Sequence, residues 1–134
     1  MEHTLEDLLE MPCRVIDILP VQVPENSPGQ YFAVEKYFLQ KDRLAEIKRR
    51  HIGVLLKLNC YRQLSFYGED AVNPPPERIA EAVQTRRACI LAREALIVSE
   101  PDETWLTVFN ADEPLLRLLG ALAASEGLFL WDPQ

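Results

Sequence analysis

The sequence predicts an α+β domain over residues 1–134, a two-layer sandwich with helices mainly on one face of a mixed or mainly antiparallel sheet. A length of 134 residues, with 48% hydrophobic and 26% charged side chains, is typical of one globular domain that can bury a core. Apolar residues switch between helical and alternating spacing without the regular strand–helix–strand order of a parallel sheet. Two strand-like segments within residues 89–109, separated by a turn, predict an antiparallel hairpin.

The first thirty residues predict a short helix, a strand and a loop. Thr4 can cap a helix over residues 4–10, because Asp7 three residues later completes a capping-box pattern. Residues 13–23 place apolar, often β-branched side chains on both faces of a strand. The proline and glycine residues within 24–29 indicate a loop.

The next segment changes to helical spacing and then to strict alternation. Two apolar stripes carry the helical spacing, namely Tyr31, Val34 and Phe38, then Leu44, Ile47 and His51. The polar residues 40–42 between them predict two helices or one kinked helix, which Gly53 should end. Alternating apolar residues from 54 to 60 predict a strand, and residues 64–67 predict its continuation or a short neighbour.

Prolines and turn residues divide the second half of the chain. The prolines at 74–76 predict the start of a helix, because proline suits the first helical turn. Residues 89–98 predict one strand, which the turn at 99–103 connects to a second strand over residues 104–109.

A last helix and strand complete the predicted fold. Asn110 and Asp112 can each cap a helix that runs to about Glu126, and Gly127 is a natural residue to follow its end. Residues 128–131 then predict a short buried strand. We expect this helix and this strand to belong to the core.

The net charge of −7 is distributed unevenly. Residues 1–30 hold six acidic and one basic residue (−5), residues 31–67 hold three and eight (+5), and residues 68–134 hold twelve and five (−7). A net acidic chain repels nucleic acid at long range, so we expect no tight binding to RNA or DNA. The sequence has no run typical of a membrane-spanning helix and an acidic first segment, which favours a cytoplasmic protein without a membrane partner.

Standard catalytic and ligand-binding motifs are missing from the sequence. Its five glycines are too dispersed for a phosphate-binding loop, and no serine- or histidine-based catalytic motif occurs. Cys13, Cys60 and Cys89 are an odd number, lie far apart and have no histidine at zinc-finger spacing. We therefore predict no catalytic residue, no cofactor and no metal, and we expect buried cysteines and a fold without disulfides.

Asp17 is the most unusual polar residue, because it lies among apolar residues of the first predicted strand. A carboxylate there needs a partner or a cavity. In the strand predicted over residues 54–60, Lys57, Asn59 and the following Tyr61 alternate on one face. If the two strands are neighbours, Asp17 and Lys57 can pair and the four residues form a polar binding pocket. The alternative is a polar sheet face in contact with solvent.

A basic segment and a histidine offer further candidates. Five basic residues between 41 and 50, including Arg49 and Arg50, form either a solvated helix face or a focused contact to RNA or DNA. His51 falls on an apolar stripe near the expected end of its helix. This position favours a half-buried side chain whose charge suits the helix dipole.

Together these features favour a non-enzymatic protein-interaction domain whose partner is another protein or a second copy of the chain. Large side chains near element ends support it, because aromatic residues are enriched at interface centres: Tyr61, Phe66, Tyr67, Phe129 and Trp131. We predict a partner surface that includes Tyr67, Arg49 and Arg50. Two alternatives stay open, a small-molecule-binding or enzymatic domain with a polar pocket around Asp17 and Lys57, and a nucleic-acid contact through the helix at 41–50.

Overall fold

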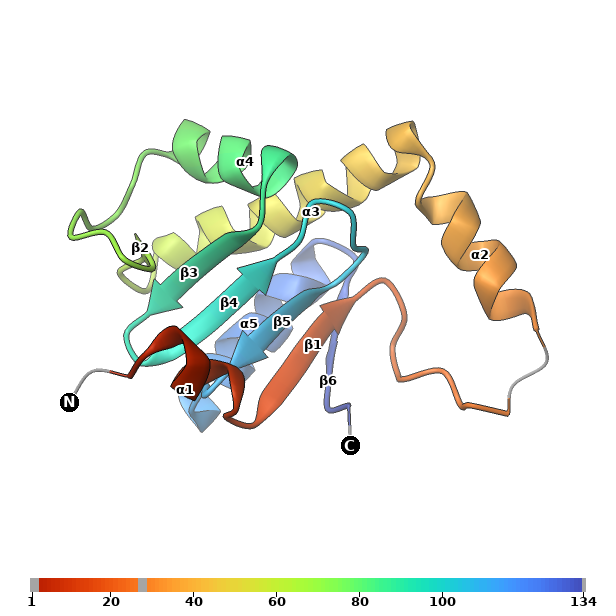
Figure 1. Cartoon of the computed structure of the whole chain (residues 1–134), viewed down its shortest axis with the longest axis horizontal. Coiled ribbons are helices and arrows are strands. Elements are labelled where there is room, and N and C mark those ends of the chain that lie inside the picture. Colours follow the sequence, from red (N-terminus) through yellow and green to blue (C-terminus); the bar gives the residue numbers. More distant parts are fainter. Residues whose placement is uncertain (1–2, 27–28, 134) are drawn as a thin grey trace.

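The computed structural model describes residues 3–26 and 29–133, and its architecture confirms the α+β class. These described residues form one six-stranded sheet in the order β2-β3-β4-β5-β1-β6, and every neighbouring pair is antiparallel (Figure 1). The strands are β1 (Cys13–Asp17), β2 (Ser65–Phe66), β3 (Ala88–Ala92), β4 (Ala95–Ser99), β5 (Leu106–Phe109) and β6 (Phe129–Trp131).

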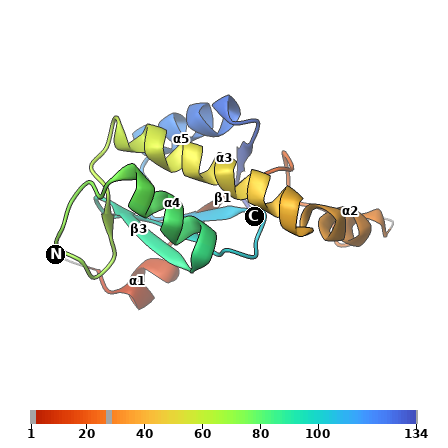
Figure 2. The ribbon, with the colours of Figure 1, turned by 90° about the horizontal axis from the view of Figure 1, so that it is seen from above.

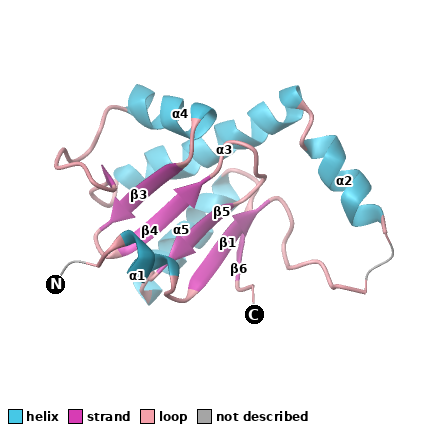
Figure 3. Cartoon of the chain, viewed as in Figure 1, coloured by secondary structure: helices cyan, strands magenta, loops and turns pink. Residues whose placement is uncertain are grey.

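Helices cover the sheet unequally. They are α1 (Leu5–Leu9), α2 (Gln30–Phe38), α3 (Lys41–Asn59), α4 (Pro76–Thr85) and α5 (Glu113–Ser125). In Figure 2, α3 and α5 lie on one side of the sheet and the short α1 lies on the other. α2 extends from the start of α3 beyond the edge of the sheet (Figure 3). The expectation of helices mainly on one face is therefore confirmed.

The main core lies between the sheet and α3, α4 and α5. It is formed by alternate residues of the strands, such as Ile16, Ile97 and Leu106, together with the apolar stripes of the three helices. The intervening strand residues face the other side, where Leu8 of α1 packs against Leu96 and Val98. This alternation follows from the two-residue period of a strand. It gives the sheet a second face, which α1 covers only over β3, β4 and β5.

The helix ends that the sequence predicted are confirmed at both ends of the chain. Thr4 and Asp7 form the expected capping box of α1. Asp112 caps α5 by accepting a hydrogen bond of 2.9 Å from the backbone amide of Leu115. Gly127 follows α5 with a φ of 74°, a conformation that favours glycine.

The strand predicted over residues 54–60 is wrong, because these residues continue α3. The apolar run satisfies both periods, and the buried residues Val54, Leu55 and Leu58 follow the helical one. Gly53 lies inside this helix instead of ending it. Its missing side chain leaves room for the carboxylate of Glu126, which approaches from the end of α5. Helical geometry also leaves Cys60 exposed, contrary to the prediction of a buried cysteine.

Two other strand predictions have the right location but the wrong extent. The first strand stops at Asp17 instead of residue 23. The segment 89–98 is two strands, β3 and β4, which form a hairpin with a tight turn at Arg93 and Glu94. Arg93 adopts a φ of 58°, and neither turn residue is proline or glycine. The usual turn signal is therefore missing from this part of the sequence.

Candidate functional site

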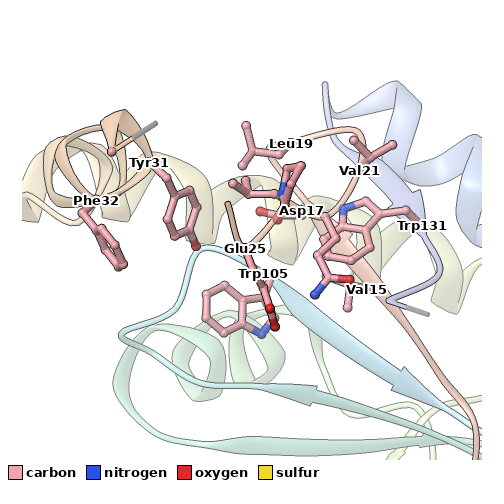
Figure 4. Close-up of a pocket in the computed structure, with 13 residues that line it drawn as sticks. Val15, Asp17, Leu19, Val21, Glu25, Tyr31, Phe32, Trp105 and Trp131 are labelled. Carbon is pink, nitrogen blue, oxygen red and sulfur yellow. The ribbon is translucent and has the colours of Figure 1, made fainter. Parts of the chain in front are cut away.

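The strongest candidate site is a pocket on the second face of the sheet, beyond the part that α1 covers. Val15 of β1 pairs with Thr107 on one side and Trp131 on the other, while the next residue, Ile16, points into the main core. Val15, Asp17 and Trp131 therefore line the same uncovered face. The segment after β1 and the first turn of α2 complete a pocket of about 370 Å³ (Figure 4).

Aromatic side chains from three parts of the chain form much of the pocket wall. Tyr31 and Phe32 come from α2, Trp105 precedes β5, and Trp131 ends β6. In Figure 4, Asp17 lies between Tyr31 on one side and Trp131 on the other, with Trp105 below them. Both tryptophans of the chain thus line the same pocket.

Asp17 is the last residue of β1 and lines this pocket. It is buried, and its Oδ1 accepts a hydrogen bond of 2.7 Å from the backbone amide of Ile18. Burial raises the pKa of the Asp17 carboxyl above its ordinary value, the amides of Ile18 and Leu19 oppose the shift, and the charge of Glu35 adds to it. The surroundings of the Asp17 carboxyl group therefore disfavour its ionised form.

The pocket is acidic as a whole. Glu25 joins Asp17 in its wall, and the described residues that line it include no Lys, Arg or His. The hydroxyl of Tyr31 donates a hydrogen bond of 3.0 Å to Oε2 of Glu35. The pKa of Tyr31 is raised by burial and by this carboxylate. Three carboxyl groups thus lie in or next to a largely apolar pocket.

One polar atom of the wall has no partner among the described residues. The indole nitrogen Nε1 of Trp131 is buried, and no hydrogen-bond acceptor for it exists in residues 3–26 and 29–133. A buried donor without an acceptor costs free energy, which a bound molecule recovers only if the Trp131 ring shifts enough for an acceptor to reach the N–H.

The structure does not bring the other predicted pocket residues to Asp17. Lys57 lies on α3, in the helical layer, where its Nζ is 2.8 Å from Oε2 of Glu126 and donates to Oγ of Ser125 at 3.0 Å. The pairing with Asp17 required residues 54–60 to be a strand next to β1, and they are a helix on the opposite face of the sheet.

The remaining two residues of that group are also elsewhere. Asn59 ends α3, and its side-chain amide donates to Oδ1 of Asn73 at 2.8 Å, which fixes the loop after β2. Tyr61 follows α3 and is 67% exposed. Asp17 is thus the one predicted binding residue that lines the pocket.

The residues of the predicted partner surface lie on two different faces. Tyr67 follows β2, and its hydroxyl accepts a hydrogen bond of 2.9 Å from the backbone amide of Leu5 in α1. Arg49 and Arg50 lie on α3, across the sheet, and both pair with Glu46. The aromatic residues proposed with them also differ in burial, because Phe66 is buried whereas Phe129 is exposed.

A buried polar cluster under the turn after β4 is a feature that the sequence interpretation missed. Lys48, expected on a solvated helix face, is buried and donates to Oγ of Ser99 and to the backbone carbonyls of Glu100 and Glu103. Its position four residues after Leu44 and three before His51 places it on the apolar stripe. That spacing is the signal that could have located it.

His51 differs from the prediction of a half-buried, charged side chain, because it is fully buried one turn after Lys48. Burial and then the charge of Lys48 lower the pKa of His51 to about 3, and the backbone of Thr104 opposes this shift. The ring is therefore neutral at pH 7. No described residue makes a well-formed hydrogen bond to either ring nitrogen.

α2 presents a second kind of candidate site, an apolar surface. None of its nine residues is buried, although large apolar side chains make up much of it. Tyr31, Glu35 and Phe38 are half-buried and mark its inner side. The exposed apolar residues of this helix and its end are Phe32, Val34, Tyr37 and Leu39.

Two further classes of site are absent from the described ranges. No helix there is long and apolar enough to cross a bilayer, and no three His, Cys, Asp or Glu side chains there are grouped to hold a metal ion. Comparison with protein-family models, with curated proteins and with solved structures found no match to this chain.

Proposed function

We propose that this chain is a non-enzymatic protein-interaction domain and that α2 is the segment that contacts the partner. The observation that carries the proposal is that α2 buries none of its residues while Phe32 is 73% and Tyr37 is 48% exposed. Large apolar side chains grouped on the surface of a protein are typical of an interaction site.

Helix physics supports the same proposal. A nine-residue helix is marginal by itself in water, so its stability depends on packing. Here the inner side of α2 packs only through half-buried residues, and Phe32 and Val34 remain exposed on opposite flanks of the helix. A partner that covers these flanks removes apolar surface from water and stabilises the helix in one step.

We propose a second copy of the chain as this partner because the two ends of α2 have complementary charges. The first turn of α2 lies beside the acidic pocket, which contains Asp17 and Glu25. Its other end leads directly into the first turn of α3, where Lys41 and Arg43 flank Asp42 and leave a net positive charge. Two α2 helices packed antiparallel about a two-fold axis place each acidic end next to the basic end of the other copy.

The test is the oligomeric state of the purified chain over a concentration series, measured by sedimentation equilibrium or light scattering. We expect a dimer that the double variant Val34→Ser/Tyr37→Ser converts to a monomer, since neither residue lines the pocket. The matched control is Tyr61→Ser/Val72→Ser, which removes the same two residue types from exposed positions outside α2. This control should leave the dimer intact.

Two results contradict the proposal. A chain that stays monomeric at all concentrations shows that a second copy is not the partner. A dimer that survives Val34→Ser/Tyr37→Ser shows that α2 is not the contact surface. Circular dichroism and thermal unfolding of each variant establish that a loss of dimer is not a loss of fold.

A further inference from the structure

We propose that the pocket between β1, β6 and α2 binds an organic ammonium cation, a positively charged nitrogen that carries apolar substituents and a nearby hydrogen-bond acceptor. This inference goes beyond self-association through α2, and its test is run on the Val34→Ser/Tyr37→Ser variant as well as on the wild type, because a second copy packed on α2 would bring its own basic residues next to Asp17 and Glu25. It rests on the aromatic side chains of the pocket, on its carboxylates, which no basic side chain of the described lining residues accompanies, and on the indole N–H of Trp131, which has no acceptor among the described residues.

The aromatic walls define the first property of the ligand. Faces of tryptophan and tyrosine rings attract cations, and this attraction strengthens when the cation is removed from water. Trp105, Trp131 and Tyr31 reach the same pocket from segments that are far apart in the sequence. A flat apolar ligand could use these rings as well, so the charge of the pocket must decide between the two classes.

The charge of the pocket favours the cation. Asp17 and Glu25 line it, Glu35 lies behind Tyr31, and the described lining residues supply no basic side chain. Burial and the charge of Glu35 raise the pKa of Asp17, so the surroundings disfavour its ionised form. A cation bound beside Asp17 stabilises that form, whereas an uncharged ligand leaves the carboxylate without a counter-charge.

The same features exclude an anion and favour an organic ion over a metal ion. An anion would approach two carboxylates without any basic partner from the described lining residues. Ca²⁺ and Mg²⁺ require six or more oxygen ligands including water, but much of this wall is hydrocarbon and aromatic ring. An alkylated ammonium needs no such set of oxygens and benefits from apolar contact.

The free N–H of Trp131 and the size of the pocket define the rest of the ligand. Because the buried Nε1 has no acceptor among the described residues, a ligand oxygen that reaches it after a small rotation of the Trp131 ring satisfies it. A pocket of about 370 Å³ lies within the range of small-molecule sites and is larger than a bare ammonium group requires. The ligand class is thus a small amphiphilic ammonium compound with an oxygen atom.

The experiment uses the full chain and its intrinsic fluorescence, since both tryptophans line the pocket. The probes are choline and 3,3-dimethylbutan-1-ol, which share shape and hydroxyl group but differ in charge. We expect choline to change the fluorescence saturably and to bind at least about tenfold more tightly than the neutral alcohol. Tetramethylammonium, which lacks the hydroxyl group, should bind more weakly than choline.

Two variants test the site itself. Asp17→Asn keeps the side-chain shape and should weaken choline binding by about tenfold or more, whereas the matched control Asp70→Asn, at an exposed acid, should have no effect. Trp105→Leu removes one ring and should weaken binding by several-fold even if Asp17→Asn does not fold. A lysine-containing peptide is also titrated in place of choline. Tighter binding of the peptide indicates that a protein side chain supplies the cation, and tighter binding of choline indicates a small molecule.

Three outcomes overturn the inference. These are no saturable response to choline up to about 10 mM, equal affinity for choline and the neutral alcohol, and unchanged choline affinity in the folded Asp17→Asn and Trp105→Leu variants. None of them bears on the dimer, because the Val34→Ser/Tyr37→Ser variant retains every residue of the pocket. The failure of this proposal and the failure of the α2 proposal are therefore distinguishable.

Discussion

Lys48 of α3 donates a hydrogen bond of 3.0 Å to Oγ of Ser99, the last residue of β4, and both residues are buried. The same ammonium donates to the carbonyl of Glu100 at 2.7 Å and to that of Glu103 at 3.3 Å. The three N–H donors of this ammonium group are thereby satisfied by the end of β4 and the turn that follows it. This arrangement attaches the turn between β4 and β5 to the helical layer and depends on the charge state of one lysine.

The pH dependence of stability should report on Lys48. Burial lowers the pKa of Lys48 from 10.5 to about 8, and the charges of Glu103, Asp102 and Glu100 oppose the shift. Between these two pH values the unfolded chain binds more protons at this residue than the folded chain, so the free energy of unfolding should rise with pH through this window. Urea unfolding of the wild type and of Lys48→Met at a series of pH values measures the difference, which should be absent if Lys48 titrates normally.

His51 should destabilise the fold in mild acid. Its pKa falls from 6.5 to about 3 on folding, so protonation favours the unfolded chain as the pH drops through this range. Because its buried ring lacks well-formed hydrogen bonds among the described residues, His51→Leu should be as stable as wild type at pH 7, or up to about 2 kcal/mol more stable. The gain should grow between pH 6.5 and pH 4. A variant less stable than wild type at pH 5 would show that the imidazole makes an essential contact.

Asp17→Asn should retain or increase stability at pH 7. The pKa of Asp17 is raised on folding. Asp17 therefore stabilises the folded chain at low pH, and this contribution is lost as the pH rises through the folded-state pKa. Asparagine keeps an oxygen that can accept from the Ile18 amide and removes the buried charge. Thermal unfolding at pH 7 measures the effect. A loss above about 1 kcal/mol would show that the carboxylate contributes to the fold itself.

Leu119→Ala should cost about 2–5 kcal/mol, because Leu119 is fully buried in the main core and its truncation leaves a cavity. Arg117→Ala on the exposed side of the same helix is the control and should change stability by less than about 0.5 kcal/mol. Denaturant unfolding of both variants measures the difference. Similar values for the two would mean that α5 does not anchor the core.

The sequence predicted the helices and strands correctly where capping residues and the apolar pattern indicate the same element. The capping residues Thr4 and Asp112 located α1 and α5, and Gly127 located the end of α5. The prediction failed where one pattern fits two structures, as in the segment after Gly53. The reason for that glycine is the carboxylate of Glu126, seventy-three residues away in the chain, which no local pattern can reveal.

The candidate site was predictable only in part. Asp17 is recognisable as a carboxylate among apolar residues, and it does line the pocket. Its neighbours depend on strand order, because β1 brings Trp105 and Trp131 together by pairing with β5 and β6. A strand order of this kind is a long-range property. Because residues 54–60 were predicted to be a strand, Lys57, Asn59 and Tyr61 were predicted as the neighbours of Asp17. The aromatic residues that line the pocket in the structure were not predicted there.

The position of β1 between β5 and β6 has a consequence for synthesis on the ribosome. β3, β4 and β5 follow one another in the chain without an intervening helix and pair in that order, so this meander can form from local contacts. β1 is made first, yet its partners at residues 106–109 and 129–131 are made last. Residues 13–17 therefore lack their strand partners until residues 106–109 and then 129–131 have been made. The six-stranded sheet is therefore complete only after residues 129–131 have joined β1.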